Sequence, residues 1–400
     1  MLRPYQTDAV FAMLDDLDTP GNSVLSLGTA AGKSHLIAEF VKSINSPVLI
    51  LCPNREILTQ NKEKLLKLVD KNEVGVFSAA LNEKTIKLYT FATIGSIFRK
   101  PELFSHFRVC IVDECHVVRP DKPTSMYIKL FRCNNFPKCF GLTATPYLNI
   151  TKVLYRGVED NKRVYESTTS LQLIYRMANS FWKRIIFNYD AKKLQEEGYT
   201  VPVIYKEYHL IDPEHMRLNS NGSEYDQEAF ARQVYTKEDI IADISKRAGE
   251  KYKSVLVFCA NVAQAESLHQ KVEGSEVVTA KTPAKQREQI VEKFKLGDIK
   301  ILFNVSCLTT GFDSPRTDCL ICLRPTKSIG LYQQFIGRGV RVSPETGKTH
   351  CTVIDLSGTY HRLGAAEDIR LVKKDDVYNL ESSSGKLWHD AQIGTFIIRK

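Results

Sequence analysis

The stretch from Leu27 to Phe40, LGTAAGKSHLIAEF, decides the fold of this chain. It follows the apolar run Val24–Leu27 and opens a segment with apolar residues at helical spacing, namely Ile37, Phe40, Val41 and Ile44. A glycine, a lysine and a hydroxyl residue between a strand and a helix are typical of a phosphate-binding loop. Leu27 stands where that pattern usually has its first glycine. The interpretation therefore depends on support from the rest of the chain.

The residues of this loop have distinct expected roles. Backbone N–H groups at the start of a helix can cradle phosphates, because they are not used within the helix. Lys33 can reach the β- and γ-phosphate oxygens, and the hydroxyl of Ser34 can ligate Mg²⁺. We expect the loop to hold a nucleoside triphosphate through Gly28, Thr29, Ala30, Ala31, Gly32, Lys33 and Ser34.

A pair of carboxylates follows another apolar run, Val109–Val112. Asp113 can hold Mg²⁺ through water, and Glu114 beside it can polarise the attacking water. Ligands bind where the carboxyl ends of parallel strands meet the loops, so both carboxylates should lie near the phosphate loop. An Asp-Glu pair alone is usually a solvated loop. Together the two motifs favour nucleoside triphosphate hydrolysis.

Short apolar runs alternate with helical patterns along most of the chain, as in α/β folds whose parallel sheets are covered by helices. The first set of expected strands is Val24–Leu27, Val48–Cys52, Val74–Phe77, Lys87–Phe91, Val109–Val112 and Cys139–Leu142. The second set is Val255–Cys259, Val277–Thr279, Lys300–Val305, Cys319–Leu323 and Thr352–Leu356. A chain of 400 residues is long enough for two cores. We expect one domain over 1–150, a connector or insertion over 151–236, a second domain over 237–370 and a tail over 371–400.

The composition is that of a folded soluble protein, with 43% apolar and 25% charged residues. There is no stretch of about 18 apolar residues and no apolar signal segment behind Met1. We therefore expect no membrane partner and a cytoplasmic location. The formal net charge of +9 favours a polyanionic partner, but the basic residues are scattered, so charge alone supports nucleic acid weakly.

The ten cysteines lie mostly inside apolar runs, where we interpret them as small core side chains in a reducing compartment. Cys319 and Cys322 have the spacing of metal ligands, but no second pair lies at a suitable distance. We therefore expect no structural zinc.

Further motifs follow other expected strands. They are Thr143–Pro146, Ser306–Asp313 and, later in the second region, Gln333–Arg341. Arg338 and Arg341 are three residues apart and would share one face of a helix. Phosphoryl transfer gains orders of magnitude in rate when an arginine meets the developing charge. An arginine supplied by a second domain would make hydrolysis depend on domain closure.

The order of these motifs resembles that of the superfamily 2 helicases, which have two RecA-like domains. The similar segments, from the adenine-recognising opening through motifs I, Ia, Ib, II, III, IV, V and VI, are Leu2–Gln6, Leu27–Ser34, Cys52–Glu56, Thr90–Thr93, Asp113–His116, Thr143–Pro146, Val257–Asn261, Asn304–Asp313 and Gln334–Arg341. In that superfamily the first position of motif I is often not glycine, which accounts for Leu27.

The resemblance implies a fold, cofactors and site residues. The fold is α/β with two RecA-like P-loop domains in tandem, and the cofactors are ATP and Mg²⁺, with Ser34 and Asp113 on the metal. ATP would be bound by the phosphate loop and by Arg3, Gln6, Gly311 and Asp313. The implied catalytic residues are Lys33, Asp113, Glu114, His116, Gln334, Arg338 and Arg341. The implied nucleic-acid contacts are Arg55, Thr93, Thr309 and Thr310.

Within the superfamily, the chain most resembles the bacterial RadD-type DNA-repair ATPases. The shared-looking strings are Leu2–Gln6, Val112–His116, Gly141–Pro146, Leu308–Asp313, Leu323–Thr326 and Tyr332–Gln334. Gly28 and Ala30 stand where those proteins more often have Pro and Gly, and their cysteine-rich C-terminal extension is not seen here. The repair role and the protein partners therefore stay open.

The expected partner is DNA, single-stranded or branched, with RNA as an alternative, bound by a monomer. An RNA helicase and a restriction-type translocase motor remain alternatives. So does a nucleotide-switched binding module that hydrolyses ATP slowly. In the tail, we expect Gly394–Ile398 to form a terminal strand or to be mobile.

Overall fold

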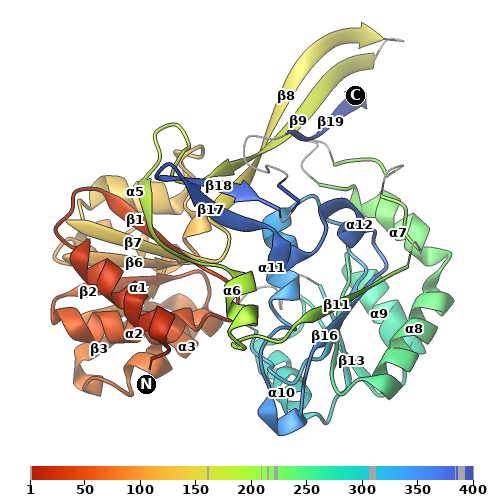
Figure 1. Cartoon of the computed structure of the whole chain (residues 1–400), viewed down its shortest axis with the longest axis horizontal. Coiled ribbons are helices and arrows are strands. Elements are labelled where there is room, and N and C mark those ends of the chain that lie inside the picture. The colour runs from red at the N-terminus through yellow and green to blue at the C-terminus, as the bar shows by residue number, and fades with distance from the viewer. Residues whose placement is uncertain are drawn as a thin grey trace. The chain divides into compact units, whose positions relative to one another are not determined.

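The computed structural model describes residues 2–159, 162–208, 210–213, 216–219, 224–305, 312–382, 384–385 and 392–399 (Figure 1). The chain forms two compact units. The first unit consists of residues 1–148 and 172–191, and the second consists of residues 149–171 and 192–400. The first unit is therefore discontinuous in sequence.

The first unit is built on an eight-stranded sheet with the order β10-β1-β7-β6-β2-β5-β3-β4. Its strands are β1 (Asn22–Leu27), β2 (Val48–Cys52), β3 (Val74–Ser78), β4 (Glu83–Lys84), β5 (Tyr89–Thr93), β6 (Val109–Asp113), β7 (Lys138–Thr143) and β10 (Trp182–Tyr189). Neighbouring strands are parallel, except that β4 runs antiparallel to β3. The helices are α1 (Pro4–Asp15), α2 (Lys33–Ile44), α3 (Arg55–Leu65), α4 (Ile94–Ile97) and α5 (Met126–Cys133).

The second unit contains a parallel six-stranded sheet with the order β11-β16-β15-β12-β14-β13. Its strands are β11 (Val203–Glu207), β12 (Val255–Phe258), β13 (Ser275–Val278), β14 (Ile301–Asn304), β15 (Cys319–Cys322) and β16 (Cys351–Asp355). The helices that follow the first unit along the chain are α6 (Ala191–Glu196), α7 (Gln227–Tyr235), α8 (Glu238–Lys251), α9 (Val262–Lys271), α10 (Ala284–Leu296), α11 (Ile329–Ile336) and α12 (Thr359–Leu363).

Eleven of these strands coincide with the apolar runs of the sequence, so the predicted α/β fold with two sheets is confirmed. Every residue of β2 and of β16 is buried. Burial on both faces is the condition that helix-covered parallel sheets impose, and it explains why these strands are continuous apolar runs.

Two smaller sheets complete the second unit. A three-stranded sheet has the order β19-β9-β8, with β8 spanning Tyr147–Glu159, β9 Lys162–Leu173 and β19 Gln392–Arg399 (Figure 1). Strand β19 is antiparallel to β9, so of the two alternatives expected for residues 394–398 the structure has the terminal strand. Strand β8 exposes large apolar side chains, among them Leu154, Tyr155 and Val158. The last sheet is the antiparallel pair β17 (Arg370–Lys374) and β18 (Val377–Glu381).

The segment 151–236, which we expected to be connector and insertion, contributes a strand to each parallel sheet. Strand β10 pairs with β1, and β11 pairs with β16. Both are outermost strands of their sheets, and their side chains are only partly buried. A search for continuous apolar runs misses strands of this kind, because one side of an edge strand faces water. The first sheet is therefore incomplete within residues 1–150.

Candidate nucleotide site

The phosphate loop joins β1 to α2 at the carboxyl edge of the first sheet. The N–H of Gly28 donates to the carbonyl of Tyr189 (2.8 Å), which anchors the loop to β10. Ala30 and Gly32 have left-handed backbone conformations, with φ of 68° and 75°. A Cβ at Gly32 would lie 2.6 Å from Nε2 of Gln6. The backbone angle of Gly32 favours glycine, and a larger residue would also displace the Gln6 amide.

Helix α1 is tied to this loop through two side chains. Gln6, which is only 4% exposed, donates from Nε2 to the carbonyl of Ala31 (2.8 Å) and accepts from the N–H of Arg3 (2.9 Å). The hydroxyl of Tyr5 donates to the same Ala31 carbonyl (2.8 Å) and its ring stacks on Tyr189 at 4.3 Å. Gln6, which the resemblance implies reads the adenine edge, and Arg3, which it implies binds ATP, therefore lie beside the phosphate loop.

Residues from three loops meet around Glu114. The ammonium of Lys33, the first residue of α2, lies 2.5 Å from Oε1 of Glu114. The hydroxyl of Thr143, at the end of β7, lies 3.5 Å from Oε2 of Glu114 and 2.8 Å from Nδ1 of His116. Glu114 itself has a positive φ of 55°, an uncommon conformation for a residue that is not glycine. The segments resembling motifs I, II and III thus converge on one carboxylate.

Asp113 lies beside this group at the end of β6 and is only 3% exposed. Its Oδ1 accepts from the N–H of Glu114 (2.9 Å), and its Oδ2 accepts from Nδ2 of Asn61 (2.8 Å). Asn61 lies on α3 and was not among the residues predicted from the sequence. Its position, six residues after the start of a polar-faced helix, gives no chemical signal in the sequence. Ser34 follows Lys33 in the first turn of α2 and is half-buried.

Burial and neighbouring charges shift the pKa values of the ionisable groups in this cluster. Burial raises the pKa of Asp113, and the Lys33 ammonium opposes that rise. For Lys33, burial works against the charge, but Glu114 and Asp113 together raise its pKa above the ordinary value. Burial lowers the pKa of His116, which keeps that imidazole neutral near pH 7. A buried carboxylate with a raised pKa gains from a nearby cation, so the donor set suits Mg²⁺ held by Asp113 and the Ser34 hydroxyl.

The candidate nucleic-acid contacts of the first unit lie at the carboxyl edge of its sheet, as the phosphate loop does. Arg55 begins α3 shortly after β2, and Thr93 ends β5. Cys52 and Thr93 are opposite each other in the pairing of β2 with β5, so these two loops are neighbours. The Arg55 guanidinium pairs with Glu56 (3.1 Å), and the Thr93 hydroxyl pairs with Ser96 (2.9 Å). Thr309, Thr310 and Gly311 lie outside the residues that the structure describes.

The two candidate arginines of the second unit converge, but not on a helix. Helix α11 ends at Ile336, before either arginine, so the prediction of a shared helical face is wrong. Both guanidinium groups instead donate to the carbonyl of Phe312, Arg338 at 2.7 Å and Arg341 at 3.2 Å. Arg341 also pairs with Asp313 (2.9 Å). After α11 the chain tightens into turns, because the N–H groups of Arg338 and Gly339 donate to carbonyls three residues back, those of Phe335 (3.1 Å) and Ile336 (2.9 Å).

Gln334, the remaining predicted catalytic residue, lies half-buried on α11. Its neighbour Gln333 has a visible structural role, because its amide donates to the carbonyls of Ala366 and Ile369, each at 2.9 Å.

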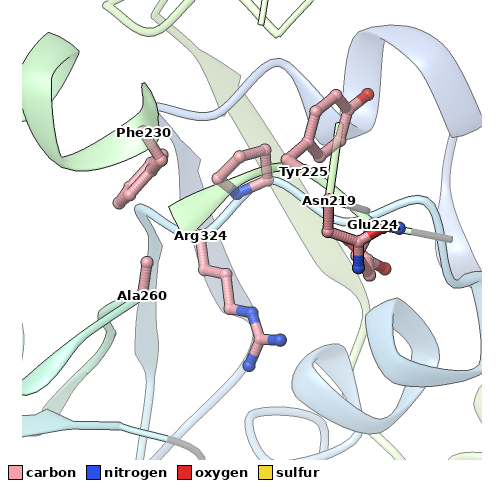
Figure 2. A pocket seen from close by; sticks show the side chains of 7 residues that line it. Asn219, Glu224, Tyr225, Phe230, Ala260 and Arg324 are labelled. Carbon is pink, nitrogen blue, oxygen red and sulfur yellow. Dashed lines mark hydrogen bonds between the residues drawn. The ribbon is translucent and has the colours of Figure 1, made fainter. Parts of the chain in front are cut away.

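The second unit also has a pocket of about 310 Å³, which the sequence motifs did not predict. Ala260 and Arg324, which line it, follow β12 and β15. Figure 2 shows the side chains of the lining residues, which are Asn219, Glu224, Tyr225, Phe230, Ala260, Arg324 and Pro325. The Glu224 carboxylate accepts from the hydroxyl of Thr326 (2.7 Å) and from the N–H of Lys327 (3.1 Å). Glu224 thus fixes the loop after β15.

The fold and the first-unit site define a P-loop nucleoside triphosphatase with two RecA-like domains. Residues 1–148 match the family model described as type III restriction enzyme, res subunit. Residues 236–343 match the helicase conserved C-terminal domain. With these two domains in this order, the chain belongs to superfamily 2 of the helicases.

Similar proteins support this assignment. The putative ATP-dependent helicase IRC3 of Saccharomyces cerevisiae is 26% identical over 381 residues, which are 90% of this chain and 52% of that protein. The DNA 3'-5' translocase XPB2 of Sulfurisphaera tokodaii is 27% identical over 364 residues, covering 85% of this chain and 78% of that protein. A solved fragment of a putative HsdR subunit of a type I restriction enzyme from Vibrio vulnificus YJ016 superposes with a TM-score of 0.63 at 18% identity, over 91% of this chain and 66% of that one. This chain thus spans about half the length of IRC3.

Proposed function

We propose that the protein is an ATP- and Mg²⁺-dependent motor that couples ATP hydrolysis to binding and remodelling of DNA. The observation that carries this proposal is the meeting of Lys33, Glu114, His116 and Thr143 from three loops at one sheet edge. A site built only to bind a nucleotide does not need a carboxylate beside the phosphate-binding lysine. A hydrolase needs one to accept a proton from the attacking water.

The proposed roles follow from these contacts. Asp113 and the Ser34 hydroxyl would hold Mg²⁺, which would supply positive charge against the phosphates. Lys33 transfers its ion pair from Glu114 to phosphate oxygens, which leaves Glu114 able to accept the proton of the attacking water. Thr143 and neutral His116 orient the second oxygen of Glu114. Arg338 and Arg341 meet the developing negative charge when nucleotide is bound.

DNA is proposed as the partner, single-stranded or branched, with Arg55, Thr93, Thr309 and Thr310 contacting its backbone. The names of several relatives support this choice, since they describe a DNA 3'-5' translocase and putative DNA 3'-5' helicases. Backbone contacts position a strand without reading its sequence. Binding should therefore be nearly independent of the DNA sequence. The logarithm of the binding constant should fall linearly with the logarithm of the salt concentration, with a slope set by the number of phosphates neutralised.

Kinship with the RadD-type DNA-repair ATPases is part of this proposal, and it rests on the shared strings in the sequence. A monomeric state and a cytoplasmic location belong to it as well. Among the residues that the structure describes, no helix has the length and apolar character needed to span a bilayer.

A second candidate is a restriction-type translocase motor, favoured by the res-subunit match over residues 1–148. An RNA helicase and a slowly hydrolysing nucleotide switch are further alternatives. All four differ in how nucleic acid changes ATP turnover.

The decisive experiment measures ATP turnover of the purified protein with Mg²⁺ over a panel of single-stranded, forked and duplex DNA and RNA. A DNA motor should be stimulated by DNA, most by single-stranded or forked DNA, and much less by RNA. Stimulation by RNA alone would favour the RNA helicase, and dependence on long duplex would favour the restriction-type translocase. Turnover that no nucleic acid changes would overturn the motor and leave the switch.

A further inference from the structure

Asn61 is buried beneath the proposed metal site and has no assigned role. It lies in the second turn of α3 and is only 1% exposed. Its Nδ2 donates to Oδ2 of Asp113 at 2.8 Å and lies 3.6 Å from Sγ of Cys52 at the end of β2. The amide therefore sits between the carboxyl ends of the neighbouring strands β2 and β6.

Packing alone does not explain an asparagine at this position. Its Oδ1 is buried and has no hydrogen-bond partner among the residues that the structure describes. A buried acceptor without a partner destabilises a fold, whereas leucine would fill a similar volume without that cost. The contact that favours asparagine here is the hydrogen bond that Nδ2 donates to Asp113.

The two hydrogen bonds on Asp113 differ in origin. The bond to Oδ1 comes from the adjacent backbone N–H of Glu114, so it moves with Asp113 itself. The bond to Oδ2 comes from another element, helix α3. This helix begins at Arg55, which is one of the proposed DNA contacts. The orientation of the Asp113 carboxylate therefore depends on where α3 lies.

We propose that Asn61 is a positioning residue that orients the Mg²⁺-holding carboxylate of Asp113 and ties it to the DNA-contacting start of helix α3. This inference rests on the proposed function. A donor to a metal-holding carboxylate fixes which lone pairs face the metal, and loss of such a partner typically weakens metal affinity 10- to 100-fold. Arg55 and Asn61 lie on the same short helix. A DNA strand bound at Arg55 can therefore shift the Asn61 amide, which donates to Asp113.

The test replaces Asn61 by leucine, which keeps the volume and removes the donor. Asn61→Gln keeps the donor on a longer side chain. The matched control is Asn134→Leu on the same unit, since Asn134 is also buried (3% exposed) and donates to the carbonyl of Pro101 rather than to the site. For each protein we would measure the Mg²⁺ concentration that gives half-maximal turnover. We would also measure the rise in melting temperature that ADP causes with Mg²⁺ and with chelator, and the stimulation by single-stranded DNA.

Asn61→Leu should raise the half-maximal Mg²⁺ concentration by about tenfold or more. It should reduce the Mg²⁺-dependent part of the ADP stabilisation while leaving the part seen with chelator unchanged. It should also reduce stimulation by DNA without changing DNA affinity. Asn61→Gln should fall between wild type and Asn61→Leu, and Asn134→Leu should change the melting temperature alone.

Two results would overturn the inference while the proposed function stands. One is a wild-type Mg²⁺ requirement and wild-type DNA stimulation in Asn61→Leu. The other is an equal change in Asn134→Leu, which would make the effect one of general destabilisation. A wild-type protein without Mg²⁺-dependent turnover would instead overturn the proposed function and this inference with it.

Discussion

Lys33 and Glu114 touch each other, yet their removal should have different effects. Lys33 would contact the phosphates before and during the reaction, so Lys33→Ala should lose ATP affinity and turnover together. Glu114 would act only in proton transfer, so Glu114→Gln should keep ATP binding while turnover falls about 10²- to 10⁴-fold. A fluorescent ATP analogue gives the affinity and phosphate release gives the rate. Wild-type hydrolysis by Glu114→Gln would show that the general base has been misassigned.

The neutral state of His116 predicts a pH dependence of stability. Burial holds its folded-state pKa below the ordinary value of about 6.5. As the pH falls below that value, the unfolded chain takes up a proton that the folded protein does not, so the free energy of unfolding decreases. His116→Gln cannot titrate, so its melting temperature should fall less than that of wild type between about pH 7 and about pH 5.5. Equal slopes for the two proteins would contradict a buried neutral histidine, since the other titrating groups are common to both.

Arg338 and Arg341 should affect turnover although they belong to the second unit. Alanine at either position should reduce turnover by about three orders of magnitude or less, with a modest change in nucleotide affinity. Arg341→Ala should also loosen the loop that holds Asp313, because it removes an ion pair at 2.9 Å. Steady-state kinetics would separate the two effects. A large loss of nucleotide affinity with normal turnover at saturation would show that these arginines bind nucleotide without stabilising the transition state.

The residues with recognisable chemistry at strand ends could be predicted from the sequence. Lys33, Asp113, Glu114 and His116 follow apolar runs, and in a parallel sheet such positions share one edge. Asn61 could not be predicted, because its neighbour in space is 52 residues away and its spacing in the helix has no special meaning. The tie between Gln6 and Ala31 depends in the same way on a left-handed loop conformation that the sequence does not reveal.

At the scale of single elements, the strand cysteines lead to a prediction about metal content. Cys110, Cys319 and Cys322 are buried in β6 and β15, and burial raises the pKa of each thiol well above its usual value. Zinc binds thiolates, and such thiols resist ionisation. The purified protein should therefore carry no structural zinc, and a chelator should leave its melting temperature unchanged without nucleotide. Stoichiometric zinc by elemental analysis would contradict the assignment of these cysteines to the core.

Most of the strands that the sequence revealed are buried along nearly their whole length, and the edge strand β13, half-buried at its two middle residues, is an exception. Continuous apolar runs predicted eleven strands of the two parallel sheets. Strands β8, β9, β10 and β11 were missed, because edge strands and small antiparallel sheets keep polar residues on their open side. The pattern of β10, buried at its first residue, again at its fourth and at its last, matches neither strict alternation nor a continuous run.

At the scale of the whole molecule, the discontinuity of the first unit predicts which fragment should fold and bind ATP. Residues 1–191 with 149–171 replaced by a short Gly/Ser linker contain the complete first sheet, including β10 beside β1. This fragment should fold and bind ATP but hydrolyse it very slowly, because Arg338 and Arg341 are absent. Residues 1–150 lack β10 and should melt at a lower temperature. Melting by circular dichroism and turnover assays test both, and rapid hydrolysis by the first fragment would remove the need for a second-unit arginine.

The order of strands in the β19-β9-β8 sheet has a consequence for synthesis on the ribosome. Strand β9 is translated before every strand of the second parallel sheet, whereas β19 is translated after all of them. Throughout that interval one edge of β9 stays open beside β8, whose Leu154 and Tyr155 are exposed even in the finished protein. Open strand edges pair readily with other chains. The nascent polypeptide therefore carries an open strand edge, at which a chaperone would prevent pairing with other chains, from the synthesis of β9 until that of β19.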